Sequence, residues 1–201
     1  MRSAAQISLM EYFKEAVESA VEKLRLQVSE HTEFYLVNLL TTFARTEKMR
    51  KAPTVGEERS YAELLLESPG YDLVQQTKIL KFIGDVTLFR SGYFSDSFKR
   101  GLLDLDYYTS LGTISYKRLC QMLGGTSRST GLEELYTELA ERFMDLVDVV
   151  AEVSEAGRTS GSIDLLRVYE RWIRTRSKRD AALLKREGIE PLTDISPKFI
   201  H

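Results

Sequence analysis

The segment LEELYTELAERFMDLVDVVAEVSE, residues 132–155, decides the fold class because its apolar and charged side chains separate onto two sides of a helix. At about 100° per residue, one side carries apolar and aromatic side chains throughout. These are Leu132, Leu135, Tyr136, Leu139, Phe143, Leu146, Val147, Val150 and Val153. The opposite side carries eight acidic residues, with Arg142 as the one basic residue. The pattern predicts a single amphipathic helix with its apolar side in a core.

Outward from this helix, apolar residues recur every three or four positions along most of the chain. Further helices are expected over residues 4–28, 29–43, 61–67, 73–94, 104–123 and 163–187. Ser29 is suited to cap the second of them, and polar, Gly-containing stretches at 51–60, 124–131 and 156–162 predict connections. We therefore expect an all-α single-domain bundle of about five to seven mostly antiparallel helices over residues 1–188, followed by a C-terminal tail over 189–201.

Composition limits the classes of protein to which the chain can belong. Its 201 residues suffice for one domain, and 43% hydrophobic with 29% charged residues is typical of a globular protein. The single Cys120 cannot form an intrachain disulfide, which indicates a reducing compartment. No signal peptide and no apolar run of about 20 residues is evident, so we expect a cytoplasmic protein without a membrane partner.

The segment 73–94 is the most apolar of the expected helices and carries the first candidate site. Within it, Thr77, Gly84 and Ser91 lie seven residues apart, which predicts a shallow strip where another helix approaches closely. Residues 34–43 are apolar on every side, which predicts a second helix surrounded by others.

Polar groups on the segment 73–94 need partners, because a charge buried without one is costly. Asp85 and Arg90 lie on this segment, and the candidate partners on the next one are Asp104, Asp106, Tyr107, Tyr108 and Tyr116. These groups form either a polar clamp that fixes the helix register or a small-molecule pocket in which carboxylates and phenols orient a ligand.

Charge is strongly segregated near the C-terminus. Residues 131–155 hold eight acids and one base, whereas residues 167–186 hold eight bases and two acids. One ridge of the basic segment carries Arg167, Arg171, Arg174 and Lys178. This ridge is a candidate contact for a protein partner, including a second copy of the chain. Nucleic acid is not expected, because the net charge is -2 and no reading motif is present.

The chain lacks the residue patterns of known metal and cofactor sites. It has two histidines and no Glu-x-x-His pair, which argues against a di-iron centre. His31 with Gly84 and Asp85 loosely resembles the haem site of haem oxygenases, but the segment around Gly84 lacks that family's glycine cluster. We therefore expect no metal and no cofactor.

Three stretches resemble a group of uncharacterised bacterial helical proteins. They are KFIGDVTLFRSGYFSDSFKRGLLDLDYY (residues 81–108), EFYLVNLLTTFAR (33–45) and LLRVYERWIRT (165–175). The resemblance implies a bacterial, all-helical cytoplasmic protein. It assigns no activity and no catalytic or binding residue to this chain.

Two functions follow as hypotheses. The first is a non-enzymatic helical interaction or regulatory module that self-associates, because charge is segregated and no complete catalytic constellation is present. The alternative is a small-molecule-binding or enzymatic bundle with a polar pocket around Asp85, Arg90 and residues 104–108.

Overall fold

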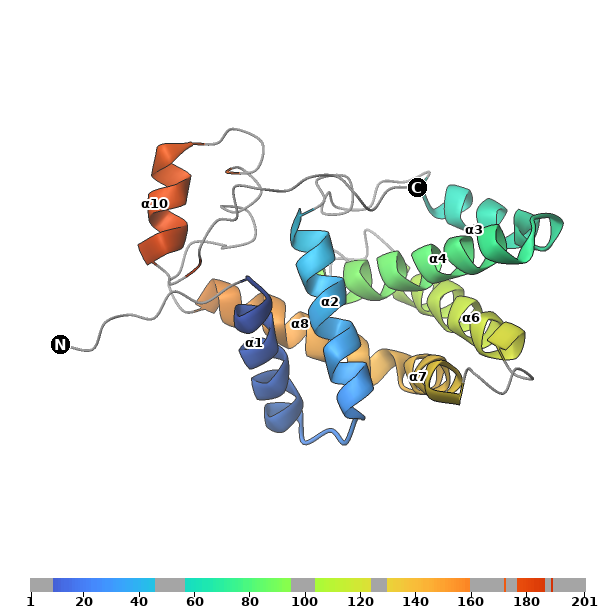
Figure 1. Cartoon of the computed structure of the whole chain (residues 1–201), viewed down its shortest axis with the longest axis horizontal. Coiled ribbons are helices and arrows are strands. Elements are labelled where there is room, and N and C mark those ends of the chain that lie inside the picture. The colour runs from blue at the N-terminus through green and yellow to red at the C-terminus, as the bar shows by residue number, and fades with distance from the viewer. Residues whose placement is uncertain are drawn as a thin grey trace.

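The computed structural model describes residues 9–45, 57–94, 104–123, 130–159, 172, 177–186 and 189. In these ranges the chain forms eight α-helices, one short 3-10 helix and no strand (Figure 1). The helices are α1 (Leu9–Leu24), α2 (Glu30–Arg45), α3 (Glu57–Glu67), the 3-10 helix η2 (Ser68–Gly70), α4 (Leu73–Tyr93), α6 (Leu105–Leu123), α7 (Thr130–Glu141), α8 (Phe143–Thr159) and α10 (Lys178–Arg186). The prediction of an all-α single-domain bundle is confirmed. Over the described ranges, no helix is both long and apolar enough to cross a membrane.

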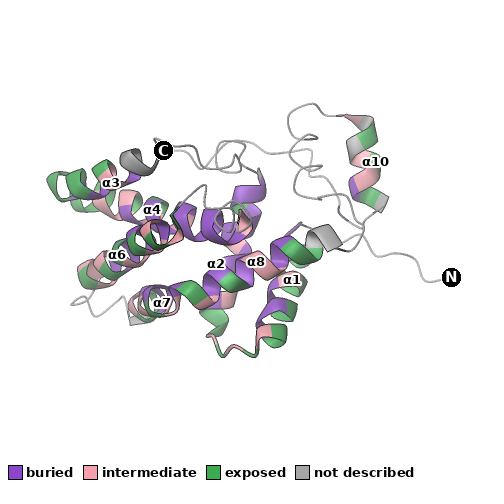
Figure 2. Ribbon diagram, turned by 180° about the vertical axis from the view of Figure 1, so that it is seen from behind, coloured by how far each residue is buried: buried purple, intermediate pink, exposed green. Residues whose placement is uncertain are grey.

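Helix α4 lies between α3 and α6, and it also contacts α2 and α8 (Figure 1). From Leu80 onward most of its side chains are buried, and the rings of Phe89 and Phe43 of α2 stack with centroids 4.3 Å apart. Figure 2 shows that buried residues are concentrated in α4 and α8, whereas α3 also carries exposed positions. The start of α4 differs from the prediction, because Leu73 and Val74 are 69% and 63% exposed.

Small residues allow α4 to approach its neighbours closely. A Cβ atom added at Gly84 would lie 2.4 Å from the Tyr116 ring of α6, and one added at Gly92 would lie 2.5 Å from Val150 of α8. Within the predicted strip, Gly84 and Ser91 are buried, whereas Thr77 is only partly buried. The close approach at Gly84 is thus the part of the prediction that the structure confirms.

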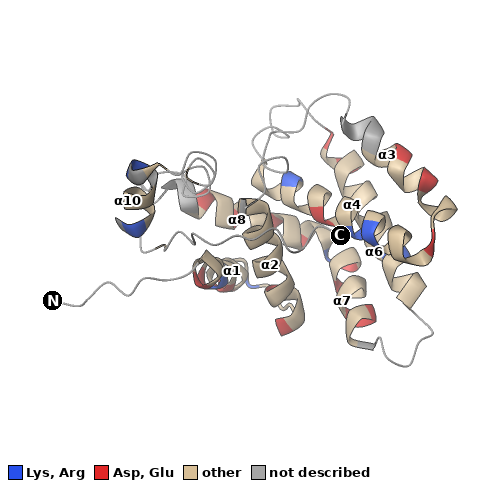
Figure 3. Cartoon of the chain, turned by 45° about the horizontal axis from the view of Figure 1, so that its top comes forward, with Lys and Arg blue, Asp and Glu red and all other residues tan. Residues whose placement is uncertain are grey.

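The segment that decides the fold class is divided into two helices. Leu139, Phe143 and Val150 are buried as expected, but Leu132 is half exposed. The predicted single helix instead forms α7 and α8, which point in different directions on either side of Arg142 (Figures 1 and 3). The Arg142 N–H donates to the Glu138 carbonyl, and its own carbonyl accepts from the Leu146 N–H, so helical bonding continues through the junction.

Several predicted boundaries need correction. Helix α3 begins at Glu57 instead of residue 61, so the end of the predicted connection 51–60 is helical. Helix α1 ends at Leu24 rather than at residue 28, because Arg25 adopts a left-handed φ of 53°. The N–H groups of Arg25 and Leu26 donate to the carbonyls of Glu22 and Val21, which is a Schellman motif. The predicted joint at 156–162 is helical as far as Thr159, since one glycine weakens a helix without forbidding it.

Ser29 performs the capping role that the sequence predicts. Its Oγ accepts from the Thr32 N–H at 3.2 Å, and α2 begins at the next residue. In the predicted helix 163–187, the structure describes Trp172, which is buried, and residues 177–186, which include α10. Ile189, the first residue of the expected tail, is buried and donates its N–H to the Leu184 carbonyl. The remainder of that helix and tail lies outside the described residues.

Candidate functional site

The carboxylate of Asp85 is the centre of a polar cluster between helices. Its Oδ1 accepts hydrogen bonds from the hydroxyls of Tyr35 on α2 and Tyr116 on α6, the latter at 2.9 Å. Its Oδ2 forms an ion pair with Lys81, one turn earlier on α4. The Asp85 side chain is 15% exposed. Both of its carboxylate oxygens therefore make their bonds in a mostly buried environment.

Aromatic rings enclose this carboxylate. Tyr136 of α7 lies edge-on to Tyr35 at 6.3 Å between centroids and is tilted against Tyr116 at 5.9 Å. The Lys81 ammonium lies 4.9 Å from the centroid of the Tyr35 ring. We call Tyr35, Lys81, Asp85, Tyr116 and Tyr136 the Asp85 cluster. It joins α2, α4, α6 and α7.

The phenols of the cluster are held in their neutral form. Burial, followed by the negative charge of Asp85, raises the pKa of Tyr35 and of Tyr116 well above the usual value. The same two causes raise the pKa of Tyr136 to about 12. The hydroxyls of Tyr35 and Tyr116 therefore remain hydrogen-bond donors to Asp85.

The other predicted pocket residues occupy different environments. Arg90 is buried and its guanidinium lies 5.6 Å from the centroid of the Tyr61 ring. Asp104 caps α6 by accepting from the Tyr107 N–H at 3.2 Å, and Asp106 is exposed on the first turn. Tyr108 is buried with its ring edge-on to Tyr107. Within the predicted set, the side chains of Asp85 and Tyr116 are joined by a hydrogen bond.

Tyr35, Tyr136 and Lys81 were not among the predicted site residues. Tyr35 lies about 50 residues before Asp85 in the sequence, and Tyr136 lies about 50 residues after it. Because the prediction considered only consecutive helices, it could not include these two tyrosines. A signal was present for Lys81, since it precedes Asp85 by four residues and such pairs meet on a helix surface. His31 is exposed at the start of α2.

The charge segregation seen in the sequence has a partial structural explanation. Figure 3 shows acidic residues on α7 and α8 and basic residues on α10. Two of the acids serve contacts with the N-terminal helices: Glu152 of α8 pairs with Lys23 of α1, and Glu138 of α7 binds the start of α2. Arg167, Arg171, Arg174 and the side chain of Lys178 lie outside the described residues.

Glu138 closes the N-terminus of α2 from a different helix. Its carboxylate accepts from the Ser29 N–H at 3.0 Å, from the Ser29 hydroxyl and from the Thr32 hydroxyl at 2.6 Å. Burial raises the pKa of Glu138, but these hydrogen bonds and the charge of Arg142 outweigh it, so the pKa lies below its usual value.

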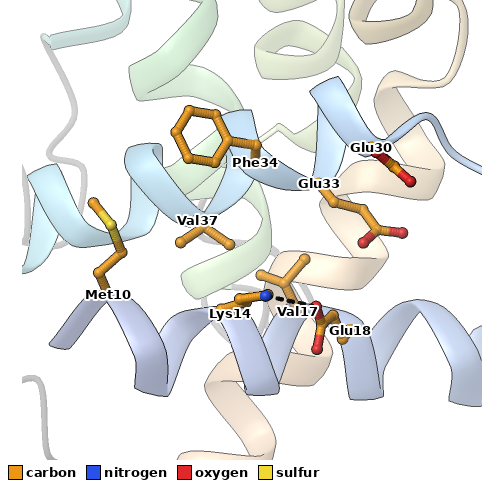
Figure 4. A pocket seen from close by; sticks show the side chains of 8 residues that line it. All are labelled: Met10, Lys14, Val17, Glu18, Glu30, Glu33, Phe34 and Val37. Atoms are coloured by element: carbon orange, nitrogen blue, oxygen red, sulfur yellow. Dashed lines mark ion pairs between the residues drawn. The ribbon is translucent and has the colours of Figure 1, made fainter. Parts of the chain in front are cut away.

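A groove between α1 and α2 is the second candidate site (Figure 4). Its volume is about 560 Å³, within the usual range of ligand and segment-binding sites. We call it the α1–α2 groove. Its lining residues are Met10, Lys14, Val17, Glu18, Glu30, Glu33, Phe34 and Val37. Val17 and Val37 are buried at its floor, whereas Phe34 is 64% and Met10 41% exposed.

The acidic side chains of the groove gather at one end. In Figure 4, Glu33 extends from α2 toward α1, where Glu18 lies, and Glu30 stands beside it. Partial burial, then the charges of Glu18 and Glu30, raises the pKa of Glu33. Lys14 lies 3.8 Å from Glu18 and is the one base in the lining. The groove therefore has an apolar floor and a net acidic edge.

One residue of this groove was expected in the core. Phe34 was predicted to lie on a helix surrounded by others, and the structure corrects this, because Phe34 is exposed. A signal was available at Phe34, which directly follows Glu30 and Glu33 in the first turn of α2. Acidic residues favour the N-terminal end of the helix dipole and are mostly exposed, so an apolar residue beside them is a candidate for exposure.

A smaller depression of about 230 Å³ lies between η2, α4 and α6, and is lined by Pro69, Gln76, Arg118, Gln121 and Met122. There the Arg118 guanidinium already donates to the Leu65 carbonyl at 2.9 Å. Within the described ranges, no group of three or more potential ligand side chains is arranged to hold a metal ion.

Comparison of the chain with known proteins reveals no relative whose function could help to interpret these sites. No protein-family model matches the chain, and neither a curated protein nor a solved structure matches it significantly. The resemblance to an uncharacterised bacterial family therefore stays a prediction, and function has to be argued from the two sites themselves.

Proposed function

We propose that this chain is a non-enzymatic helical interaction module and that the α1–α2 groove is its docking surface for a protein segment. The observation that carries the proposal is the exposure of Phe34 and Met10 beside a groove whose floor is formed by Val17 and Val37. Large apolar side chains around a concave surface are typical of sites that bind other proteins.

The state of the Asp85 cluster favours this function over a polar ligand pocket. Asp85 accepts from two tyrosines and pairs with Lys81, so its hydrogen-bonding capacity is used by the chain's own side chains. A ligand entering there would have to displace bonds already made in a mostly buried environment. The cluster is better suited to hold four helices in register.

Self-association, a bacterial origin and a cytoplasmic location stay predictions from the sequence. Sedimentation velocity over a range of concentrations tests the first: a concentration-dependent dimer supports it, and a monomer throughout contradicts it. The docking proposal has its own test, because a groove can bind a different protein while the chain is monomeric.

That test is selection of displayed peptides against the folded chain, followed by affinity measurement on two variants. Phe34→Ala removes an exposed ring from the groove, and Met144→Ala removes an exposed apolar side chain from α8, outside the groove lining. We expect selected peptides to lose about tenfold or more in affinity with Phe34→Ala and to be unaffected by Met144→Ala. Equal effects of the two variants would contradict docking at this groove.

A further inference from the structure

Resting on the proposed function, we infer that the partner segment is a basic amphipathic helix. Its apolar side lies on Val17 and Val37 beside Phe34, and its lysine or arginine side chains lie among Glu18, Glu30 and Glu33.

The first argument is charge complementarity. Three carboxylates and one ammonium line the groove, which leaves a formal charge of -2 when all are ionised. Lys14 lies 3.8 Å from Glu18 and is largely exposed, so its pairing is weak. Glu30 and Glu33 bring two more charges within the same lining, and the described contacts include no base beside them other than Lys14. A basic partner would relieve their mutual repulsion.

The arrangement of charge and apolar surface supplies the second argument. Figure 4 shows Met10 and Val37 toward one end of the groove and Glu18, Glu30 and Glu33 toward the other. A partner that is only basic would leave Phe34 and Met10 in water, and a partner that is only apolar would bury carboxylates without compensation. A segment with separate apolar and basic sides satisfies both ends.

The shape of the groove favours a helical partner. Helices α1 and α2 are neighbours joined by residues 25–29, and the groove runs between them. Its lining on α1 extends from Met10 to Glu18, a length of about 12 Å at 1.5 Å per residue. A third helix can lie in the depression between two others with apolar residues at positions i, i+3, i+4 and i+7.

The same charges argue against three other occupants of this groove. Two copies meeting groove to groove would place Glu18, Glu30 and Glu33 against their own equivalents, or would bury them without a base against the apolar end of the second groove. Nucleic acid and anionic lipid surfaces would place negative charge against negative charge. Each of these contacts is unfavourable, so we commit to the basic helix.

Three fluorescent peptides of 16 residues or so test the inference by anisotropy with the intact chain. They share one leucine stripe at helical spacing and differ on the other side, which is lysine, glutamine or glutamate. We expect the lysine peptide to bind about tenfold more tightly than the glutamine peptide, and the glutamate peptide to bind most weakly. Raising the salt concentration to 0.5 M should reduce the difference, because screening weakens exposed charge pairs.

Matched variants show where the peptides bind. Glu33→Gln removes one charge from the groove and should weaken the lysine peptide several-fold while leaving the glutamine peptide unchanged. Glu141→Gln removes an exposed acid from α7 and is the control, since Glu141 is outside the groove lining. Thermal unfolding of each variant, followed by circular dichroism, establishes that it is folded.

The outcomes separate this inference from the proposed function. If the lysine and glutamine peptides bind equally and Phe34→Ala weakens both, the groove docks a helix but the basic partner is wrong. If no peptide responds to Phe34→Ala, both the docking proposal and the inference are overturned. Equal loss of affinity in Glu33→Gln and Glu141→Gln would show a diffuse charge effect and would also overturn the inference.

Discussion

Phe34 and Tyr35 are neighbours on α2, yet they belong to opposite kinds of surface. Tyr35 turns into the bundle and donates its hydroxyl to Asp85, where three other helices meet α2. Phe34, about 100° further around the helix, is exposed at the edge of the α1–α2 groove. One helix thus contributes one side to an enclosed polar cluster and another side to an open apolar groove.

This contrast predicts which substitutions change stability and which change binding. The Asp85 cluster uses its hydrogen bonds within the chain, so substitutions there should change the free energy of unfolding. The α1–α2 groove keeps apolar and acidic groups in contact with water, so substitutions there should change binding and leave unfolding nearly unaffected. Four comparisons, ordered by the size of the expected stability effect, test this division.

The largest effect is expected from Asp85→Ala. It removes the acceptor of Tyr35 and of the fully buried Tyr116, and leaves those hydroxyls without the bonds they make now. We expect a loss of about 3 kcal/mol in the free energy of unfolding, or about 6–12 °C in Tm, measured by thermal and urea unfolding. Asp106→Ala, at an exposed carboxylate on α6, should cost about 0.5 kcal/mol. Equal losses for the two variants would show that the cluster does not stabilise the bundle.

Gly84→Ala tests the close packing of α4 on the same cluster. The added Cβ would lie 2.4 Å from Cε1 of Tyr116, whose ring is held in place by the hydrogen bond to Asp85. We expect a loss of about 2 kcal/mol in urea unfolding, because the ring or the helix must shift. Gly131→Ala on α7 is the matched control: a Cβ there meets nothing within 4 Å, so stability should stay the same or rise.

Glu138→Gln should have a smaller and pH-dependent effect. We expect the free energy of unfolding to fall by about 1 kcal/mol near pH 7. The reason is that the variant weakens the hydrogen bonds that the Ser29 N–H and the Thr32 hydroxyl donate to the Glu138 carboxylate. The pKa of Glu138 is lowered in the folded chain, so its contribution is present above the unfolded pKa and is lost as pH falls through the folded one. The difference between wild type and variant should therefore shrink below about pH 4. A difference that stays constant from pH 7 to pH 3 would contradict this role of the carboxylate.

Local sequence patterns predicted the helices well, because each depends on residues close together in the chain. The Ser29 cap needs only its own hydroxyl and the N–H of Thr32, and the burial of α4 agrees with the apolar composition of the segment 73–94. The division at Arg142 escaped prediction because the apolar side continues through it without an interruption. Arg25 gave no signal either, since glycine or asparagine is the usual residue at such a helix end.

The candidate sites were harder to predict because they depend on which helices meet. Asp85 and Tyr116 lie on the consecutive helices α4 and α6 and were expected to interact, whereas Tyr35 and Tyr136 reach the same carboxylate from more distant parts of the chain. The α1–α2 groove was not predicted, because its prediction requires knowing which side chains stay uncovered. Periodicity identifies an apolar residue such as Phe34, but it does not show whether a neighbouring helix covers it.

The smallest stability effect, and the sharpest separation, is expected between Phe34→Ala and Tyr35→Phe. Phe34 is 64% exposed, so its truncation should change the free energy of unfolding by less than about 0.5 kcal/mol while weakening peptide binding about tenfold. Tyr35→Phe removes one of the two hydroxyls that Asp85 Oδ1 accepts from, and should cost about 1 kcal/mol without affecting peptide binding. Both variants are measured by urea unfolding and by anisotropy with the same peptide. If Phe34→Ala destabilised the chain as much as Tyr35→Phe, the ring of Phe34 would be packed against the rest of the bundle. That result would contradict the proposal that the α1–α2 groove is a free docking surface.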